Sequence, residues 1–112
     1  DEAGEALPIF QAAGLDLIHL VAPTTAAQRK SQICRTATGF LYYISLKGVT
    51  GARTNLAVDL HTPLAELRAC TNLPVAVGFG ISTPEQARTV GEVADGVVVG
   101  SALIDLIFKN SE

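Results

Sequence analysis

Four short apolar runs recur along the chain, and they constrain its fold more than any other feature. They occupy residues 15–22, 39–45, 73–77 and 95–99. Each run is rich in Val, Ile, Leu or Tyr and barely alternates apolar with polar residues, which is typical of strands buried on both faces. Helical stretches separate the runs. A helix followed by four strand–helix units predicts right-handed crossovers, a parallel sheet and an α/β fold.

Three of the predicted helices begin at recognisable capping residues. Residues 25–28 fit a capping box in which Thr25 would cap the first of these helices. Thr62 precedes Pro63, which predicts an N-cap followed by proline at the first helical position. Residues 83–86, Thr-Pro-Glu-Gln, combine a cap, an early proline and a capping-box glutamine. They form the strongest helix start in the chain.

The length of the chain is small for the number of strand–helix units that it carries. A complete (β/α)₈ barrel needs about 250 residues, and these four strands occupy a chain of 112. The chain also opens inside a predicted helix, without a preceding cap or strand. These features predict a truncated barrel that forms one domain over residues 1–112. A flavodoxin-like open sheet is the structural alternative.

Charge and hydropathy exclude several classes of protein. The net charge is −3, and Arg29 and Lys30 form the only adjacent basic pair, so a nucleic-acid partner is not expected. No apolar run reaches the roughly 18 residues of a membrane span, and the acidic start does not resemble a signal peptide. An anionic ligand remains compatible, because helix N-termini and backbone amides bind phosphate without basic side chains.

The two cysteines, Cys34 and Cys70, lie in predicted helices and belong to no Cys-x-x-Cys pair. Isolated cysteines of this kind are usually buried thiols in a reducing cytoplasm. We therefore expect free thiols here, in preference to a disulfide or a metal site.

Three glycine-bearing loops follow successive predicted strands, at residues 45–51, 78–82 and 100–102. The carboxyl ends of parallel barrel strands share one rim, so these loops should converge. Glycine lets the backbone approach an anion closely. Ser101 also opens a short apolar helix over residues 102–108, whose first turn would offer N–H groups and the positive end of a dipole. These loops predict a phosphate site between the last strand–helix turns.

The same segments resemble the tryptophan synthase alpha chain over nearly the whole sequence. Residues 14–25 resemble the fifth strand of that family, and residues 42–53, 73–86 and 94–102 resemble its sixth, seventh and eighth strands with their loops. The Gly-Val-Thr-Gly loop and the Gly-Phe-Gly-Ile-Ser stretch are the most specific parts. The resemblance implies about the last four βα units of a TIM (β/α)₈ barrel. It also implies a cytoplasmic protein, or a plastid one in a plant.

The resemblance further implies a lyase that cleaves indole-3-glycerol phosphate to indole and glyceraldehyde 3-phosphate, without a cofactor or a metal. The residues implied to bind the substrate phosphate are Gly51, Gly80, Gly100 and Ser101. Phe79 and Val98 would line the indole pocket. Tyr42 would sit beside the catalytic carboxylate, and Thr50 would belong to the mobile loop. Tyr42 and Phe79 as core aromatics, and Thr50 as a turn residue, are the structural alternatives.

The catalytic pair of the family has no counterpart in this chain. The cleavage needs a proton donor and a base. In the family these are a glutamate and an aspartate from the second strand and its loop, and nothing here aligns with that region. Of the other acidic side chains, Asp16 and Asp95 are expected at the opposite rim, and Glu66, Glu85, Glu92 and Asp105 on solvated helices. Asp59 is unassigned, and His19 and His61 are expected in structural roles. We expect phosphate binding without detectable catalysis.

Three functional interpretations remain open at this point. The first is part of an alpha-chain lyase, whose family partner is a pyridoxal-phosphate-dependent beta chain that receives indole. The second is a non-catalytic phosphate-binding half-barrel that closes its open edges by homodimerisation. The third is another phosphate-binding barrel enzyme, such as a phosphoribosyl isomerase or an indole-glycerol phosphate synthase. The Gly-Val-Thr-Gly-Ala-Arg loop argues against this third interpretation, because those families place other residues there. Lys47 and Arg53 flank the Gly-Val-Thr-Gly loop and either steer an anionic substrate or are solvated charges.

Overall fold

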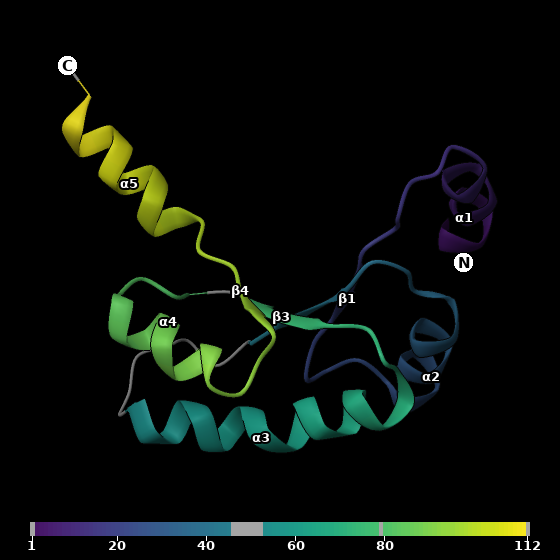
Figure 1. Ribbon diagram of the computed structural model, residues 1–112, viewed down its shortest axis with the longest axis horizontal. Helices are drawn as coiled ribbons and strands as arrows, with labels where there is room; N and C mark the ends of the chain where they lie inside the picture. Colours follow the sequence, from purple (N-terminus) through teal and green to yellow (C-terminus); the bar gives the residue numbers. More distant parts are fainter. Residues whose placement is uncertain (1, 46–52, 79, 112) are drawn as a thin grey trace.

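A parallel sheet lies at the centre of the computed structural model, which describes residues 2–45, 53–78 and 80–111 (Figure 1). Its strands are β1 (His19–Val21), β2 (Leu41–Ile44), β3 (Val75–Gly78) and β4 (Gly96–Val97), hydrogen-bonded in that spatial order. All three neighbouring pairs are parallel. Each strand lies in one of the four apolar runs, apart from the last residue of β3, so the predicted α/β fold is confirmed.

The helices divide into a group that covers the sheet and a pair that does not. They are α1 (Glu2–Ala12), α2 (Ala27–Thr36), α3 (Arg53–Cys70), α4 (Pro84–Gly91) and α5 (Ser101–Asn110). Figure 1 shows α2, α3 and α4 together on one side of the sheet, and α1 and α5 apart from each other on the other side. One sheet face is therefore packed by helices, and the other is left largely open within the described residues.

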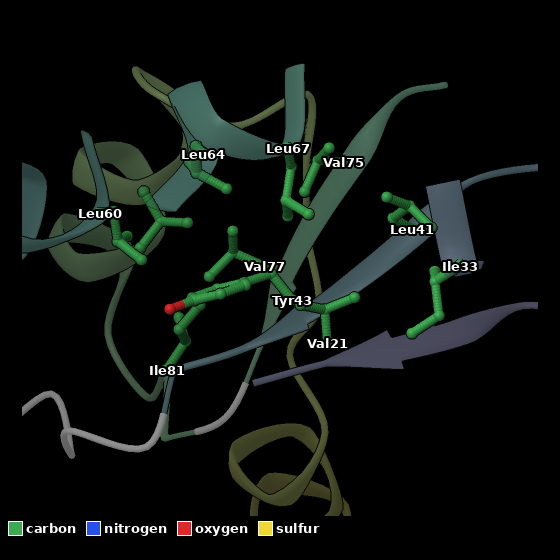
Figure 2. Packing of buried hydrophobic residues seen from close by; sticks show 11 residues of the cluster. Val21, Ile33, Leu41, Tyr43, Leu60, Leu64, Leu67, Val75, Val77 and Ile81 are labelled. Atoms are coloured by element: carbon green, nitrogen blue, oxygen red, sulfur yellow. The ribbon is translucent and has the colours of Figure 1, made fainter. Parts of the chain in front are cut away.

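The core fills the space between the sheet and α3. Leucines at positions 60, 64 and 67 recur at helical spacing and point from α3 onto the strands, as Figure 2 shows. The strand residues of the same core are Val21, Leu41, Tyr43, Val75 and Val77, all nearly inaccessible to solvent. Because successive strand side chains alternate between faces, Tyr43 enters this core while Tyr42 points to the open face. Burial, and then the charge of Glu66, raise the pKa of Tyr43.

Helix α3 begins well before the predicted start at Thr62. It starts at Arg53, and Pro63 lies inside it, so the predicted N-cap is wrong. An interior proline removes one helical hydrogen bond and costs about 3 kcal/mol in a helix. The stripe formed by Leu60, Leu64 and Leu67 runs across the proline and is almost completely buried. Burial of that stripe offsets the cost of the proline. The prediction of an N-cap at Thr62 rested on local sequence alone, which does not show this burial.

The other two predicted helix starts differ in their outcome. Ala26 is the N-cap of α2 and makes no capping bond, while the Thr25 hydroxyl accepts a hydrogen bond from the Ala22 amide at 2.9 Å. The capping box at residues 25–28 is therefore wrong, because a local turn uses that hydroxyl. The capping box of α4 is confirmed. Thr83 accepts from the Gln86 amide, and the Gln86 side chain accepts from the Thr83 amide.

The expectation of two free thiols is also wrong. Cys34, in the last turn of α2, and Cys70, the last residue of α3, form a disulfide with their Cα atoms 5.8 Å apart. One helical turn earlier on the same two helices, Lys30 Nζ lies 3.7 Å from Glu66 Oε2. We call this line of contacts the α2–α3 seam. The seam arises because consecutive crossover helices pack side by side, which brings together residues 36 apart in the sequence.

Candidate functional site

A hollow of about 680 Å³ lies at the carboxyl ends of the strands, between the turn after β3 and helix α5. The predicted site residues that the structure describes all line it: Tyr42, Gly80, Val98, Gly100 and Ser101. They come from three successive strand–helix units. The convergence that was expected of parallel strands therefore occurs for these five residues.

Tyr42 reaches the hollow because its ring leans along the open face of the sheet. In register Tyr42 pairs with Ala76, but its ring lies over Gly78, two residues further toward the carboxyl end of β3. A Cβ atom added at Gly78 would fall 2.7 Å from Cζ of Tyr42, closer than packed carbon atoms approach. The missing side chain at Gly78 therefore makes room for the phenol. Val98, the residue directly after β4, donates its amide to the Val77 carbonyl of β3 and is thereby held beside the sheet.

The turn that carries Gly80 requires glycine and is fixed on its far side. Gly80 has a φ of 77°, in the left-handed region that disfavours residues with a Cβ atom. Ser82, two residues later, donates both its amide and its hydroxyl to Oε1 of Gln86 at 2.8 and 3.2 Å. The same glutamine completes the cap of α4. The turn is thus anchored to a helix, while its glycine faces the hollow.

Gly100 differs from Gly80 because the fold itself does not require glycine there. Its φ is −117°, and a Cβ atom added at this position would meet no heavy atom within 4 Å. Gly100 is the N-cap of α5, and its carbonyl accepts from the amides of Leu103 and Ile104. The amides of Ser101 and Ala102, which come before these two, have no acceptor within the helix and lie at the positive end of its dipole. Open space beside free donors suits a bound anion.

Helix α5 also contributes residues for which the sequence predicts no site role. Asp105, Leu106 and Lys109 line the hollow together with Ser101. Positions 101, 105 and 109 recur every four residues and so share one helix face, which is the signal that would have found them. Asp105 had been expected to be solvated; its side chain is exposed and borders the hollow. The hollow therefore carries one acidic and one basic side chain on the same helix.

Several predicted residues lie outside the described part of the chain. Lys47, Thr50, Gly51 and Phe79 are among them, so the Gly-Val-Thr-Gly loop has no structural description. Arg53 is described as the first residue of α3.

The other acidic residues lie away from the hollow. Asp16 and Asp95 precede β1 and β4 at the amino end of the sheet, as expected. Oδ2 of Asp95 accepts the Val75 amide at 2.9 Å and lies 3.6 Å from Arg68 Nη2, which donates to the Val93 carbonyl. Asp59, Glu66, Glu85 and Glu92 lie on or next to α3 and α4 and are exposed. None of the described carboxylates apart from Asp105 borders the hollow.

The two histidines occupy positions consistent with structural roles. His19 is the first residue of β1, and its Nε2 atom is buried without a hydrogen-bond partner among the described residues. Burial, and then the positive charge of Arg29, lower the pKa of His19. His61 lies exposed within α3, not before its cap. Among the described residues, no three His, Cys, Asp or Glu side chains group closely enough to hold a metal ion.

The described helices fall short of a membrane-spanning helix in length or in hydropathy. Not one of them combines the length and the apolar character that a crossing of the bilayer demands.

Comparison with known proteins identifies close relatives. The family model described as tryptophan synthase alpha chain matches residues 1–112. The tryptophan synthase alpha chain of Geobacter sp. strain M21 is 51% identical over 109 residues, which cover 97% of this chain and 41% of that protein. The corresponding protein of Gloeobacter violaceus is 55% identical over 108 residues, 95% of this chain and 39% of its own length.

Solved structures of the same kind match the fold. The tryptophan synthase subunit alpha of Campylobacter jejuni superimposes with a TM-score of 0.86 at 32% identity, covering 99% of this chain and 44% of that one. The subunit from Legionella pneumophila str. Paris gives a TM-score of 0.79 at 42% identity, over 96% and 38% of the two chains. The chain thus spans about two-fifths of the length of the relatives it matches. Its four strands correspond to part of their TIM barrel.

Proposed function

Because the chain belongs to the tryptophan synthase alpha chain family of tryptophan biosynthesis, we propose that its hollow binds the phosphate of indole-3-glycerol phosphate. The whole protein would be a lyase that cleaves this substrate to indole and glyceraldehyde 3-phosphate. One observation carries the proposal: Gly80, Gly100 and Ser101, from two different strand–helix turns, line the same hollow.

Backbone amides would supply most of the phosphate contacts. The first turn of α5 offers N–H donors and a dipole end, and the Ser101 hydroxyl adds one donor. Gly80 and Gly100 allow an oxygen to approach the chain, since no Cβ atom stands in front of the amides. Gly51 would complete this set from the preceding loop. Lys109 would favour the anion electrostatically and Asp105 would oppose it, so recognition depends on the amides.

The indole end of the substrate would lie toward the open sheet face. Val98 and Leu106 provide apolar wall in the hollow, and Tyr42 borders it from β2. Phe79 would lie against the indole ring, and Thr50 would belong to the loop that closes the site. Burial of an aromatic ring against such surfaces supplies affinity, while the phosphate contacts fix its orientation.

We further propose that the chain on its own binds but does not cleave. A retro-aldol cleavage requires a proton for the indole carbon that leaves and a base for the glycerol hydroxyl. Asp105 is the one described carboxylate at the hollow, and it stands on α5, the helix whose first turn would hold the phosphate. The two family carboxylates would have to come from a region that this chain does not match.

The proposed partner is the beta chain of the family, in the cytoplasm. A second candidate, a homodimeric half-barrel that binds phosphate, is favoured by the uncovered apolar surface. Leu20 on the open sheet face is 58% exposed, and several large apolar residues of α5 are exposed as well. Such surface is normally covered by further protein. A sizing measurement separates the two candidates, because only the second requires a dimer of the chain by itself.

Calorimetric titration with glycerol 3-phosphate tests the proposed function. Ser101→Ala should weaken binding about tenfold, since a hydrogen bond to a charged group is lost. Ser111→Ala is the matched control, because Ser111 is the C-cap residue at the other end of α5, and it should bind as the parent does. Equal affinity for all three proteins would overturn the phosphate assignment. Release of indole from indole-3-glycerol phosphate by the chain alone would overturn the proposed lack of cleavage.

A further inference from the structure

We propose that Cys34 and Cys70 form a redox-responsive site, in which oxidation of two thiols locks helix α2 to helix α3. The oxidant would be a small-molecule disulfide such as oxidised glutathione. This site is separate from the hollow and goes beyond the proposed function. It responds to the redox state of the surroundings, not to substrate.

The packing of the two helices would also hold the cysteines close together in the reduced chain. Ile33 and Leu67 are buried in the shared core next to the seam and hold α2 and α3 in place. Lys30 and Glu66 pair across the seam one turn earlier. The Cα atoms of Cys34 and Cys70 are 5.8 Å apart, within the usual range for a disulfide. The native fold therefore presents both sulfur atoms to each other at a high effective concentration.

The difference in exposure of the two cysteines sets the order of the chemistry. Cys70 is exposed at the end of α3, and Cys34 is half-buried against the core. The Cys70 thiolate attacks one sulfur of oxidised glutathione, whose S–S bond breaks and releases one glutathione thiolate. The Cys34 thiolate then attacks the Cys70 sulfur of the mixed disulfide and releases the second. The protein loses two electrons and two protons, and two molecules of reduced glutathione are formed.

The position of the bond decides what oxidation affects. Both cysteines lie near the C-terminal ends of helices, which places them at the amino end of the sheet. The hollow lies at the carboxyl end of the sheet. The cross-link closes a segment of chain that contains β2 and α3, so it restricts the unfolded chain more than it alters the site. Oxidation should therefore change stability and leave phosphate binding unchanged.

Thiol mapping tests the site directly on the 112-residue chain. The reduced protein is equilibrated with oxidised and reduced glutathione, free thiols are alkylated, and a non-reducing tryptic digest is analysed by mass spectrometry. We expect peptide 31–35 linked to peptide 69–88, formed at a lower ratio of oxidised to reduced glutathione in buffer than in urea. Absence of the linked peptide, or the same midpoint in buffer and in urea, would overturn the proposal.

Thermal unfolding of the same samples provides the second measurement. Closure of this loop should raise the Tm of the oxidised chain above that of the reduced chain by about 10 °C or more. Cys34→Ala, which can go only as far as the mixed disulfide at Cys70, and Cys70→Ala are matched variants whose Tm should not rise on oxidation. Equal Tm values for the oxidised and reduced parent would contradict the lock. Affinity for glycerol 3-phosphate is recorded in parallel, so failure of the hollow to bind is distinguished from failure of the redox site.

Discussion

The two ends of the sheet are built in different ways. At the amino end, side chains hold the elements together. The α2–α3 seam carries a disulfide and an ion pair, and Asp95 accepts the Val75 amide. At the carboxyl end, glycine turns and the first turn of α5 leave backbone donors beside open space. The difference fits the proposed division, in which one end provides stability and the other binds a ligand.

The two faces of the sheet show a similar division. The face toward α3 buries its strand side chains almost completely, and the opposite face leaves Leu20 more than half exposed. The adjacent residues Tyr42 and Tyr43 illustrate it, because Tyr43 is buried in the core while Tyr42 borders the hollow. Substitutions on the covered face should therefore act on stability, and substitutions near the carboxyl end should act mainly on binding.

The largest effect is expected from a leucine on the covered face. Leu64 is fully buried, and Leu64→Ala should lower the free energy of unfolding by about 3 kcal/mol, since it removes buried methyl groups and leaves a cavity. Leu103→Ala is the same change on α5, where the side chain is 53% exposed, and should cost less than about 1 kcal/mol. Urea unfolding of the 112-residue chain measures both. Equal costs would erase the distinction between the covered and uncovered helices.

A smaller effect is expected where the open face meets the hollow. Gly78→Ala places a methyl group against the Tyr42 ring and should cost about 2 kcal/mol, because the ring must move. Gly96→Ala on the neighbouring strand is the control, since its Cβ atom would lie 3.4 Å from that of Ala76, close to ordinary contact. Combining Gly78→Ala with Tyr42→Ala should recover part of the loss in a double-mutant cycle. Strict additivity of the two changes would show that the ring does not occupy this space.

The pH dependence of stability should be smaller again. The folded chain holds the pKa of His19 below its ordinary value of about 6.5, so the unfolded chain binds more protons below that pH. The contribution of His19 is complete above pH 6.5 and is lost as the pH falls toward the folded pKa. His19→Gln should reduce the loss of stability between pH 7.5 and 5.5 in urea unfolding. The exposed His61→Gln should leave the loss unchanged, and the reverse pattern would refute the assignment.

The smallest effect on stability is expected at Gly100. Because a Cβ atom there meets no other heavy atom and φ is negative, Gly100→Ala should change the free energy of unfolding by less than about 0.5 kcal/mol. The same methyl group would stand where a phosphate oxygen approaches the α5 amides, so glycerol 3-phosphate should bind at least about tenfold more weakly. A large loss of stability without a change in affinity would reverse the roles given to the two ends of the sheet.

Local signals predicted the parts of the molecule that local interactions determine. The strands followed from their apolar runs, and the cap of α4 followed from Thr83 and Gln86. The start of α3 and the Cys34–Cys70 bond did not follow from local signals, because both depend on how the helices pack in the folded chain. In the hollow, Gly80, Gly100 and Ser101 were found from glycine turns and from resemblance. The spacing of Asp105 and Lys109 places them on the helix face of Ser101, but whether that face borders the hollow depends on the direction in which α5 leaves the sheet.

The central claim is that backbone amides from two separate turns bind one phosphate group. Amide chemical shifts recorded by NMR during titration with inorganic phosphate and then glycerol 3-phosphate test it most directly. We predict that the amides of Gly80, Gly100 and Ser101 shift together and fit a single dissociation constant, while Thr71 at the amino end stays unchanged. Shifts at only one of the two turns, or none at any of these three amides, would contradict it.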